Sequence, residues 1–168
     1  LKMVLADGSL DYPDELLAQL DLVVGAVHSA FKQPKGEMTS RICKALRNPY
    51  VSILAHPTAR LIGERNPVDL DLDQVFRTAL AHGKAVEINS HPLRLDLNDI
   101  HARRARELGV PIVISTDTHI LDQLETIATQ LGVEVHVGFV GDPRAVYAVS
   151  EAFYAVDARV VAQLDVLA

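Results

Sequence analysis

The stretch Gly109–His119, which reads GVPIVISTDTH, decides how the fold is interpreted. Its β-branched run Ile112–Ile114 is typical of a buried strand, and the polar residues from Ser115 onward end that strand abruptly. Asp117 and His119 stand two positions apart, so in extended backbone their side chains point the same way. A carboxylate and an imidazole would then face one point at the mouth of a sheet or barrel, and this pair suits Zn or Mn. Taken alone, such a pair is more often a loop aspartate beside an exposed histidine.

The same alternation of strand and helix fills the chain before this stretch. Strands are predicted at 2–5, 22–27, 51–55, 85–89 and 112–114. Helices are predicted to open at 11–15 and to span 37–46, 71–82 and 98–108, with Asp71 or Asp73 as a cap and with Gly83 and Gly109 as closing residues. Strands separated by helices of this length predict an α/β fold with parallel strands and right-handed crossovers.

Four consecutive predicted strands each end in a polar loop that carries a histidine. These histidines are His28, His56, His91 and His119. A single histidine after a strand is usually a packed or solvated residue, but four at equivalent positions would converge on one rim if the strands form a barrel. The pattern therefore predicts a metal or phosphoester site at the carboxyl ends of the strands. His82 and His101 do not share this placement, and we expect them to be structural or solvent-facing.

Composition narrows the class of protein. The chain has 168 residues, is 49% hydrophobic and carries a net charge of −6, which fits one globular domain and argues against a free-standing nucleic-acid binder. It does not argue against a catalytic module that uses metal ions to hold phosphates. The single cysteine, Cys43, excludes an internal disulfide and favours a reducing, cytoplasmic location; we expect it to be buried in a helix. No signal peptide or membrane-spanning stretch is visible.

Several long stretches resemble the carboxyl-terminal part of a polymerase and histidinol phosphatase (PHP) domain, most like that of bacterial family X DNA polymerases. The matching stretches are DGSLDYPDELLAQLDLVVGAVHSAFKQ at 7–33, NPYVSILAHPTARLIG at 48–63 and EINSHPLRLDLNDIHARRARELGVPIVISTDTH at 87–119. The resemblance implies a distorted (β/α)7 barrel with metal ions bound at the carboxyl ends of its strands.

The resemblance also implies roles for particular residues. The positions that match metal ligands of the family are His28, His56, Asp117 and His119, and the last two form the expected catalytic pair. The implied activity is the metal-dependent removal of nucleotides from DNA 3′ ends by metal-bound hydroxide, with Mn or Zn as cofactor, together with related phosphatase activity and a role in DNA repair.

Further residues lie just beyond the predicted strand ends and are candidates for contact with substrate. Lys32, Arg60 and Arg94 could hold phosphate, and the alternative for each is a surface charge without a ligand. Asn89 and His91 are expected to form the pocket wall rather than to bind metal.

The sequence also departs from the family. The amino-terminal His-x-His motif is absent, and the position of a further family ligand falls at or near Leu1. We therefore expect a partial (β/α)7-type barrel without its amino-terminal strands at 1–124, followed by a divergent α/β extension at 125–168 that packs on the same domain. Polymerase domains of a parent protein and a DNA 3′ end or another phosphoester are the expected partners, with no membrane.

Two alternative functions stay open at this point. The chain could be a degenerate barrel remnant that acts as a non-catalytic scaffold, as the missing ligands suggest. It could also be a small-molecule phosphatase of the histidinol-phosphate type, although the DGSLDYPDE and HPLRLDLND stretches favour the polymerase relatives. Whether this fragment is active as an enzyme by itself is left open by the sequence.

Overall fold

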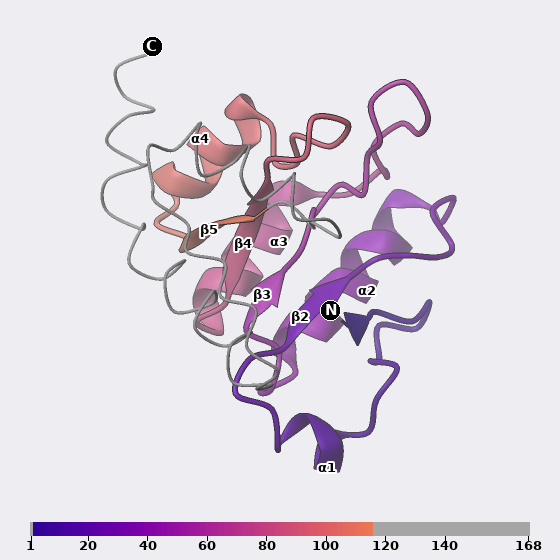
Figure 1. The fold of residues 1–168 in the computed structure, drawn as a ribbon, viewed down its shortest axis with the longest axis vertical. Helices are drawn as coiled ribbons and strands as arrows, with labels where there is room; N and C mark the ends of the chain where they lie inside the picture. The colour runs from indigo at the N-terminus through magenta and orange to yellow at the C-terminus, as the bar shows by residue number, and fades with distance from the viewer. Residues whose placement is uncertain (1, 116–168) are drawn as a thin grey trace, which may run out of the picture. The chain divides into compact units, whose positions relative to one another are not determined.

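The computed structural model describes residues 2–115, which form a parallel sheet covered by helices (Figure 1). The predicted α/β extension at 125–168 lies outside the described residues and stays a prediction. The strands are β1 (Lys2–Met3), β2 (Val24–Ala26), β3 (Ile53–Leu54), β4 (Ala85–Asn89) and β5 (Ile112–Ser115). The helices are α1 (Asp14–Leu17), α2 (Lys35–Arg47), α3 (Leu72–Ala81) and α4 (Asp99–Glu107).

The strands lie in the sheet in the order of the sequence, β1-β2-β3-β4-β5, and every neighbouring pair is parallel. The predicted α/β class and parallel pairing are therefore confirmed. Because each crossover moves one strand further in the same direction, α2, α3 and α4 lie on one side of the sheet (Figure 1). The carboxyl ends of the strands meet at one edge, and this positions the loops described below.

The predicted cap of α3 is present, and α4 has a side-chain cap as well. The Asp71 carboxylate accepts a hydrogen bond of 3.0 Å from the backbone N–H of Gln74, and Asn98 accepts one of 2.8 Å from the N–H of His101. After α3 the chain turns at Gly83, whose φ of 64° is a conformation that other residues adopt at a cost. The helix boundaries therefore follow from local capping chemistry.

The core lies between the sheet and the inner faces of α2 and α3. Leu46 of α2 and Phe76 of α3 are fully buried against Leu54 and Val86 of the sheet. Full burial of one such side chain contributes about 1.5 to 3 kcal/mol. Cys43 is also buried in α2, as expected, and its sulfur accepts a 3.3 Å hydrogen bond from the Thr78 hydroxyl.

The third strand is shorter than the sequence predicts. A strand was expected over 51–55, but β3 spans Ile53–Leu54 only. The N–H of Val51 bonds instead to the Asn48 carbonyl in the preceding turn, at 3.3 Å. Sheet hydrogen bonding does continue on either side of β3, because Ser52 donates to Val23 and Ala55 donates to Gly25. Among residues 2–115, no helix is long and apolar enough to cross a membrane.

Candidate active-site rim

The loops that follow β1, β2, β3 and β4 meet at the carboxyl edge of the sheet. Together with the carboxyl end of β4 we call them the rim (residues 4–13, 27–34, 55–70 and 87–97). His28 and His56 each stand two residues after the end of their strand, in the neighbouring loops that follow β2 and β3. Their ring centroids are 5.2 Å apart and the rings meet edge to face at 79°. The parallel register thus brings together two imidazoles that are 28 positions apart in the sequence.

The two imidazoles differ in their surroundings. His56 is buried, with 1% of its surface exposed, whereas His28 is exposed. His56 also adopts a φ of 27°, and its backbone N–H donates to the Glu87 carboxylate. Glu87 is a buried residue of β4 that also accepts from the Ser115 hydroxyl, so it connects the end of β3 with the end of β5. Glu87 is therefore a structural carboxylate of this edge.

The loop after β4 folds back onto its own strand and buries polar groups. Asn89 is fully buried and its side-chain oxygen accepts from the N–H of His91 at 3.1 Å. Asp96 exchanges two backbone hydrogen bonds with Asn89, and its carboxylate accepts from the N–H of Thr58 at 2.9 Å. Burial raises the pKa of Asp96 to about 6. Asn89 and His91 therefore lie in the rim, where the pocket wall was predicted.

The three predicted phosphate contacts lie in different environments. Arg60 donates through Nε to the Arg94 carbonyl at 2.6 Å and through Nη2 to the Leu95 carbonyl, so it ties the loop after β3 to the loop after β4. Arg94 is half-buried in the latter loop, and Lys32 is exposed in the loop after β2. Arg60 thus has a structural role that its position in the sequence did not indicate.

A buried arginine of α2 holds the loop that carries His28. Arg41 has 2% of its surface exposed and donates to the Ser29 carbonyl at 2.9 Å, to the Gln33 side chain at 3.0 Å and to the Val4 carbonyl. Sequence reasoning missed this residue, because it occupies one position on the inner face of an otherwise ordinary amphipathic helix.

Backbone strain is concentrated in the rim. The non-glycine residues with positive φ among residues 2–115 all lie in loops after β2, β3 and β4; they are Ala30, His56, Ala59 and Leu95. Such conformations cost about 1 to 3 kcal/mol each and cluster at functional sites. Strain and buried polar groups therefore coincide with the histidine pair, which favours this edge of the sheet as the functional site.

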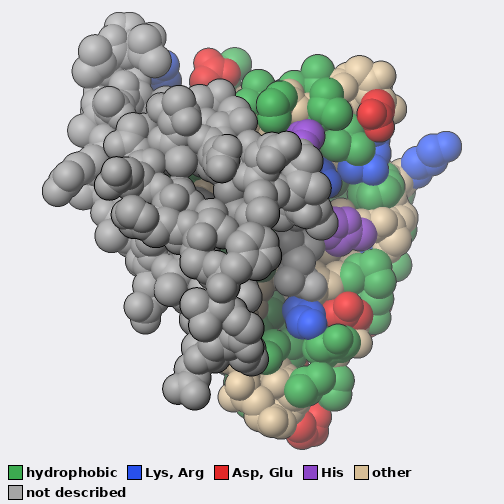
Figure 2. Space-filling view, in the orientation of Figure 1, with side chains coloured by type: hydrophobic (Ala, Val, Ile, Leu, Met, Phe, Trp, Pro, Cys, Tyr) green, Lys and Arg blue, Asp and Glu red, His purple; other side chains and the backbone are tan. Residues whose placement is uncertain are grey.

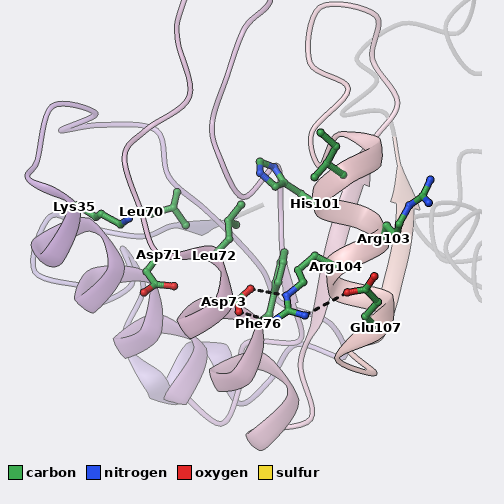
Figure 3. Close-up of a pocket in the computed structure, with 11 residues that line it drawn as sticks. Lys35, Leu70, Asp71, Leu72, Asp73, Phe76, His101, Arg103, Arg104 and Glu107 are labelled. Atoms are coloured by element: carbon green, nitrogen blue, oxygen red, sulfur yellow. Dashed lines mark hydrogen bonds and ion pairs between the residues drawn. The ribbon is translucent and has the colours of Figure 1, made fainter.

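A groove of about 570 Å³ lies elsewhere, between α3 and α4. Three of its charged groups are paired with each other, as Figure 3 shows: Arg104 donates to both oxygens of Asp73, at 2.8 and 2.6 Å, and to Glu107 at 3.3 Å. Ile100, at the edge of the groove, is 68% exposed. The groove lies on the outer surface of the helices and contains none of the predicted site residues.

Two of the predicted metal ligands, Asp117 and His119, lie outside the described residues. Their role as a catalytic pair therefore stays a prediction. Within 2–115 no group of three or more histidine, cysteine, aspartate or glutamate side chains is arranged to hold a metal ion. The described part of the chain therefore contributes a pair of adjacent imidazoles, and their role as metal ligands stays a prediction.

Similarity to known proteins covers this part of the chain. No family model matches the sequence. The chain is 44% identical over 126 residues to the DNA polymerase/3′-5′ exonuclease PolX of Bacillus subtilis, which covers 75% of the chain and 22% of PolX. It is 36% identical over 121 residues to a probable phosphatase of Acetivibrio thermocellus and 31% identical over 124 residues to one of a Thermoanaerobacter species. These matches cover 67% and 68% of the chain, but only 47% and 48% of the two phosphatases.

Proposed function

Because the chain is homologous to part of a bacterial PolX and of PHP-type probable phosphatases, we propose that it is a metal-dependent phosphoesterase module. The proposed activity is that of the 3′-5′ exonuclease part of a family X DNA polymerase, with a DNA 3′ end as substrate and polymerase domains as partners. The observation that carries the proposal is the pairing of His28 with His56 at a strained, polar edge of the sheet.

The order of the strands supports the barrel part of the proposal. In doubly wound sheets the strand order reverses at a switch point, whereas in barrels each strand lies beside the next one in the sequence. The described strands follow the second pattern without a reversal. We therefore propose a partial (β/α)7-type barrel, whose active site lies at the carboxyl ends of its strands.

The side chains present fit a divalent metal. Neutral imidazoles bind Mn and Zn, and His28 and His56 present two of them 5.2 Å apart. In the proposed site these residues would hold the metal together with Asp117 and His119. Bound divalent ions lower the pKa of water and neutralise charge on a phosphoryl group.

The protein's own contribution is to hold this edge of the sheet in place. Glu87 fixes the backbone of His56, Arg41 fixes the loop after His28, and Arg60 joins the loops after β3 and β4. Rigid placement of ligands and substrate is a large part of catalysis, because misplacement by about 1 Å can lower a rate by about 100-fold. In the same proposal Lys32 and Arg94 hold substrate phosphate.

The test is hydrolysis by the native protein with Mn, on 3′-labelled DNA and on p-nitrophenyl phosphate. His28→Ala removes an exposed imidazole, so stability should change by no more than about 0.5 kcal/mol, while turnover should fall at least about 100-fold. His82→Ala, which removes another exposed imidazole at the C-cap of α3, is the matched control and should keep full activity.

The same assay separates the alternatives. Turnover of the phosphomonoester without attack on DNA would favour a small-molecule phosphatase, an outcome that the similarity to probable phosphatases makes worth measuring. Absence of Mn-dependent turnover on both substrates would contradict the proposal and leave the non-catalytic scaffold.

A further inference from the structure

Arg65 lies in the rim loop that also carries His56 and reaches across to the loop that carries His28, although its position in the sequence gives no sign of this. Its guanidinium carbon lies 4.0 Å above the centroid of the Phe31 ring, and its Nε donates to the Ala59 carbonyl at 2.8 Å. Phe31 stands three residues after His28, and Ala59 three residues after His56. Arg65 therefore folds back onto its own loop near His56 and contacts the loop of His28, in each case three residues after the histidine.

The backbone around Arg65 is preformed. Residues 61 and 65 pair as a short antiparallel bridge, with hydrogen bonds of 2.9 and 2.8 Å between Leu61 and Arg65. The turn between them contains Gly63, with a φ of 83°. The aromatic ring below and the Nε hydrogen bond fix the plane of the guanidinium, so little side-chain freedom is left to lose when a ligand binds.

The two terminal nitrogens of this guanidinium donate no hydrogen bond within the described part of the chain. Burial lowers the pKa of Arg65 first, the neighbouring Arg94 lowers it further, and Glu64 opposes the shift. An oxyanion placed here would accept bidentate hydrogen bonds and offset the repulsion between the two arginines. Figure 2 shows Lys, Arg and His side chains close together on the visible part of the surface.

Arg60 differs from Arg65 in this respect. The Arg60 guanidinium already donates to the carbonyls of Arg94 and Leu95, so its directional donors are used within the fold. Arg65 uses only Nε in the same way. This contrast identifies Arg65, rather than Arg60, as the arginine with donors left for a ligand.

We propose that Arg65 binds a backbone phosphate of the nucleic-acid strand through its terminal guanidinium nitrogens, beside the His28–His56 pair. The proposal deepens the proposed function and rests on it for the identity of the strand. The role is that of a substrate-binding residue, with Phe31 and the Ala59 carbonyl as the supports that orient it.

Binding can be measured without catalysis. The native protein is titrated into a fluorescein-labelled single-stranded oligothymidylate in the presence of EDTA, and anisotropy is recorded between about 50 and 200 mM salt. Arg65→Gln should weaken binding about fivefold to tenfold and reduce the slope of log K against log salt by about 0.7, the value for one phosphate contact on a single strand. Arg65→Lys should restore the slope and part of the affinity, because the charge returns without the planar fork.

Arg103→Gln is the matched control, since it removes one positive charge from an exposed position on α4. It should leave affinity and slope close to those of the native protein. Native affinity and slope in Arg65→Gln would overturn the proposal. Equal losses of affinity in Arg65→Gln and Arg65→Lys, together with lowered melting temperatures, would also overturn the proposal. Arg65 would then only stabilise the loops of the rim. The binding assay contains EDTA and therefore does not depend on turnover. If the native protein fails to hydrolyse DNA in the separate Mn assay, the proposed function is contradicted but this binding role is not.

Discussion

The ends of α3 and α4 differ from the loops of the rim in how the backbone and the polar groups are held. At the helix ends, side-chain caps from Asp71 and Asn98 satisfy free N–H groups, and glycines take the positive φ angles. In the rim, alanine, histidine and leucine take positive φ angles, and carboxylates such as Glu87 and Asp96 are buried. The helix ends follow the usual preferences for capping residues and for glycine at positive φ. The rim departs from these preferences, as is typical of functional sites.

The largest expected contrast concerns two glycines with positive φ. A Cβ on Gly8, in the rim loop after β1, would lie 2.7 Å from the Arg41 carbonyl and 2.9 Å from Cβ of Lys44, whereas a Cβ on Gly83 would meet nothing within 4 Å. Gly8→Ala should therefore destabilise the fold by about 3 to 4 kcal/mol, from overlap as well as backbone strain. Gly83→Ala should cost only about 1 to 2 kcal/mol.

Urea unfolding of both variants measures this difference. Equal losses for the two glycines would mean that the loop after β1 does not press against α2, and the close packing of this part of the rim would be wrong.

The next contrast concerns pH and the buried carboxyl of Asp96. Burial raises its pKa from 3.8 to about 6 in the folded protein, so between these values the folded protein holds a proton that the unfolded chain has lost. The contribution of this carboxyl to stability should be highest below about pH 4 and should fall by about 2 to 3 kcal/mol as the pH rises to about 6. Asp96→Asn keeps an acceptor for Thr58 and should remove this fall.

Asp73, at the start of α3, should behave in the opposite direction. Its hydrogen bonds with Arg104 lower its pKa, so its contribution is present above the unfolded pKa and is lost as the pH falls. Unfolding free energies of Asp96→Asn and Asp73→Asn, measured from about pH 2 to 7 with EDTA present, test both signs, because the Asp73 contribution is lost only below its unfolded pKa of 3.8. A native-like pH slope in Asp96→Asn would show that this carboxyl is not the cause.

The smallest contrast concerns alanine replaced by glycine. Ala30, exposed in the rim with a φ of 51°, should gain up to about 1 kcal/mol of stability as glycine because strain is relieved. Ala102, inside α4, should lose about 1 kcal/mol on the same change because glycine is a poor helix former. Thermal unfolding of the two variants should shift in opposite directions, and a loss in Ala30→Gly would argue against strain at that position.

The sequence predicts the elements of the fold because their signals are local. The capping residue Asp71 of α3 and the strand β4 were predicted at the positions where they occur. The lengths of β1 and β3 were overestimated, since an apolar run does not reveal where neighbouring strands stop pairing. The strands themselves are adjacent and parallel because helices connect them in one direction.

The candidate site was predicted only in part. His28 and His56 could be paired in advance, since each follows a strand of the same sheet. The burial of Asp96 and the placement of Arg65 could not, because both depend on loops that fold back on the rim rather than on any spacing in the sequence. The roles of Asp117 and His119 stay predictions.

The central claim is that the rim holds a divalent metal through the His28–His56 pair. The most direct measurement is an electron paramagnetic resonance titration of the native protein, of His28→Ala and of His82→Ala with Mn(II), which reports free and bound ion. The account predicts that His82→Ala binds Mn(II) like the native protein, and that His28→Ala binds at least about tenfold more weakly. Native affinity for Mn(II) in His28→Ala, with the fold intact, would contradict it.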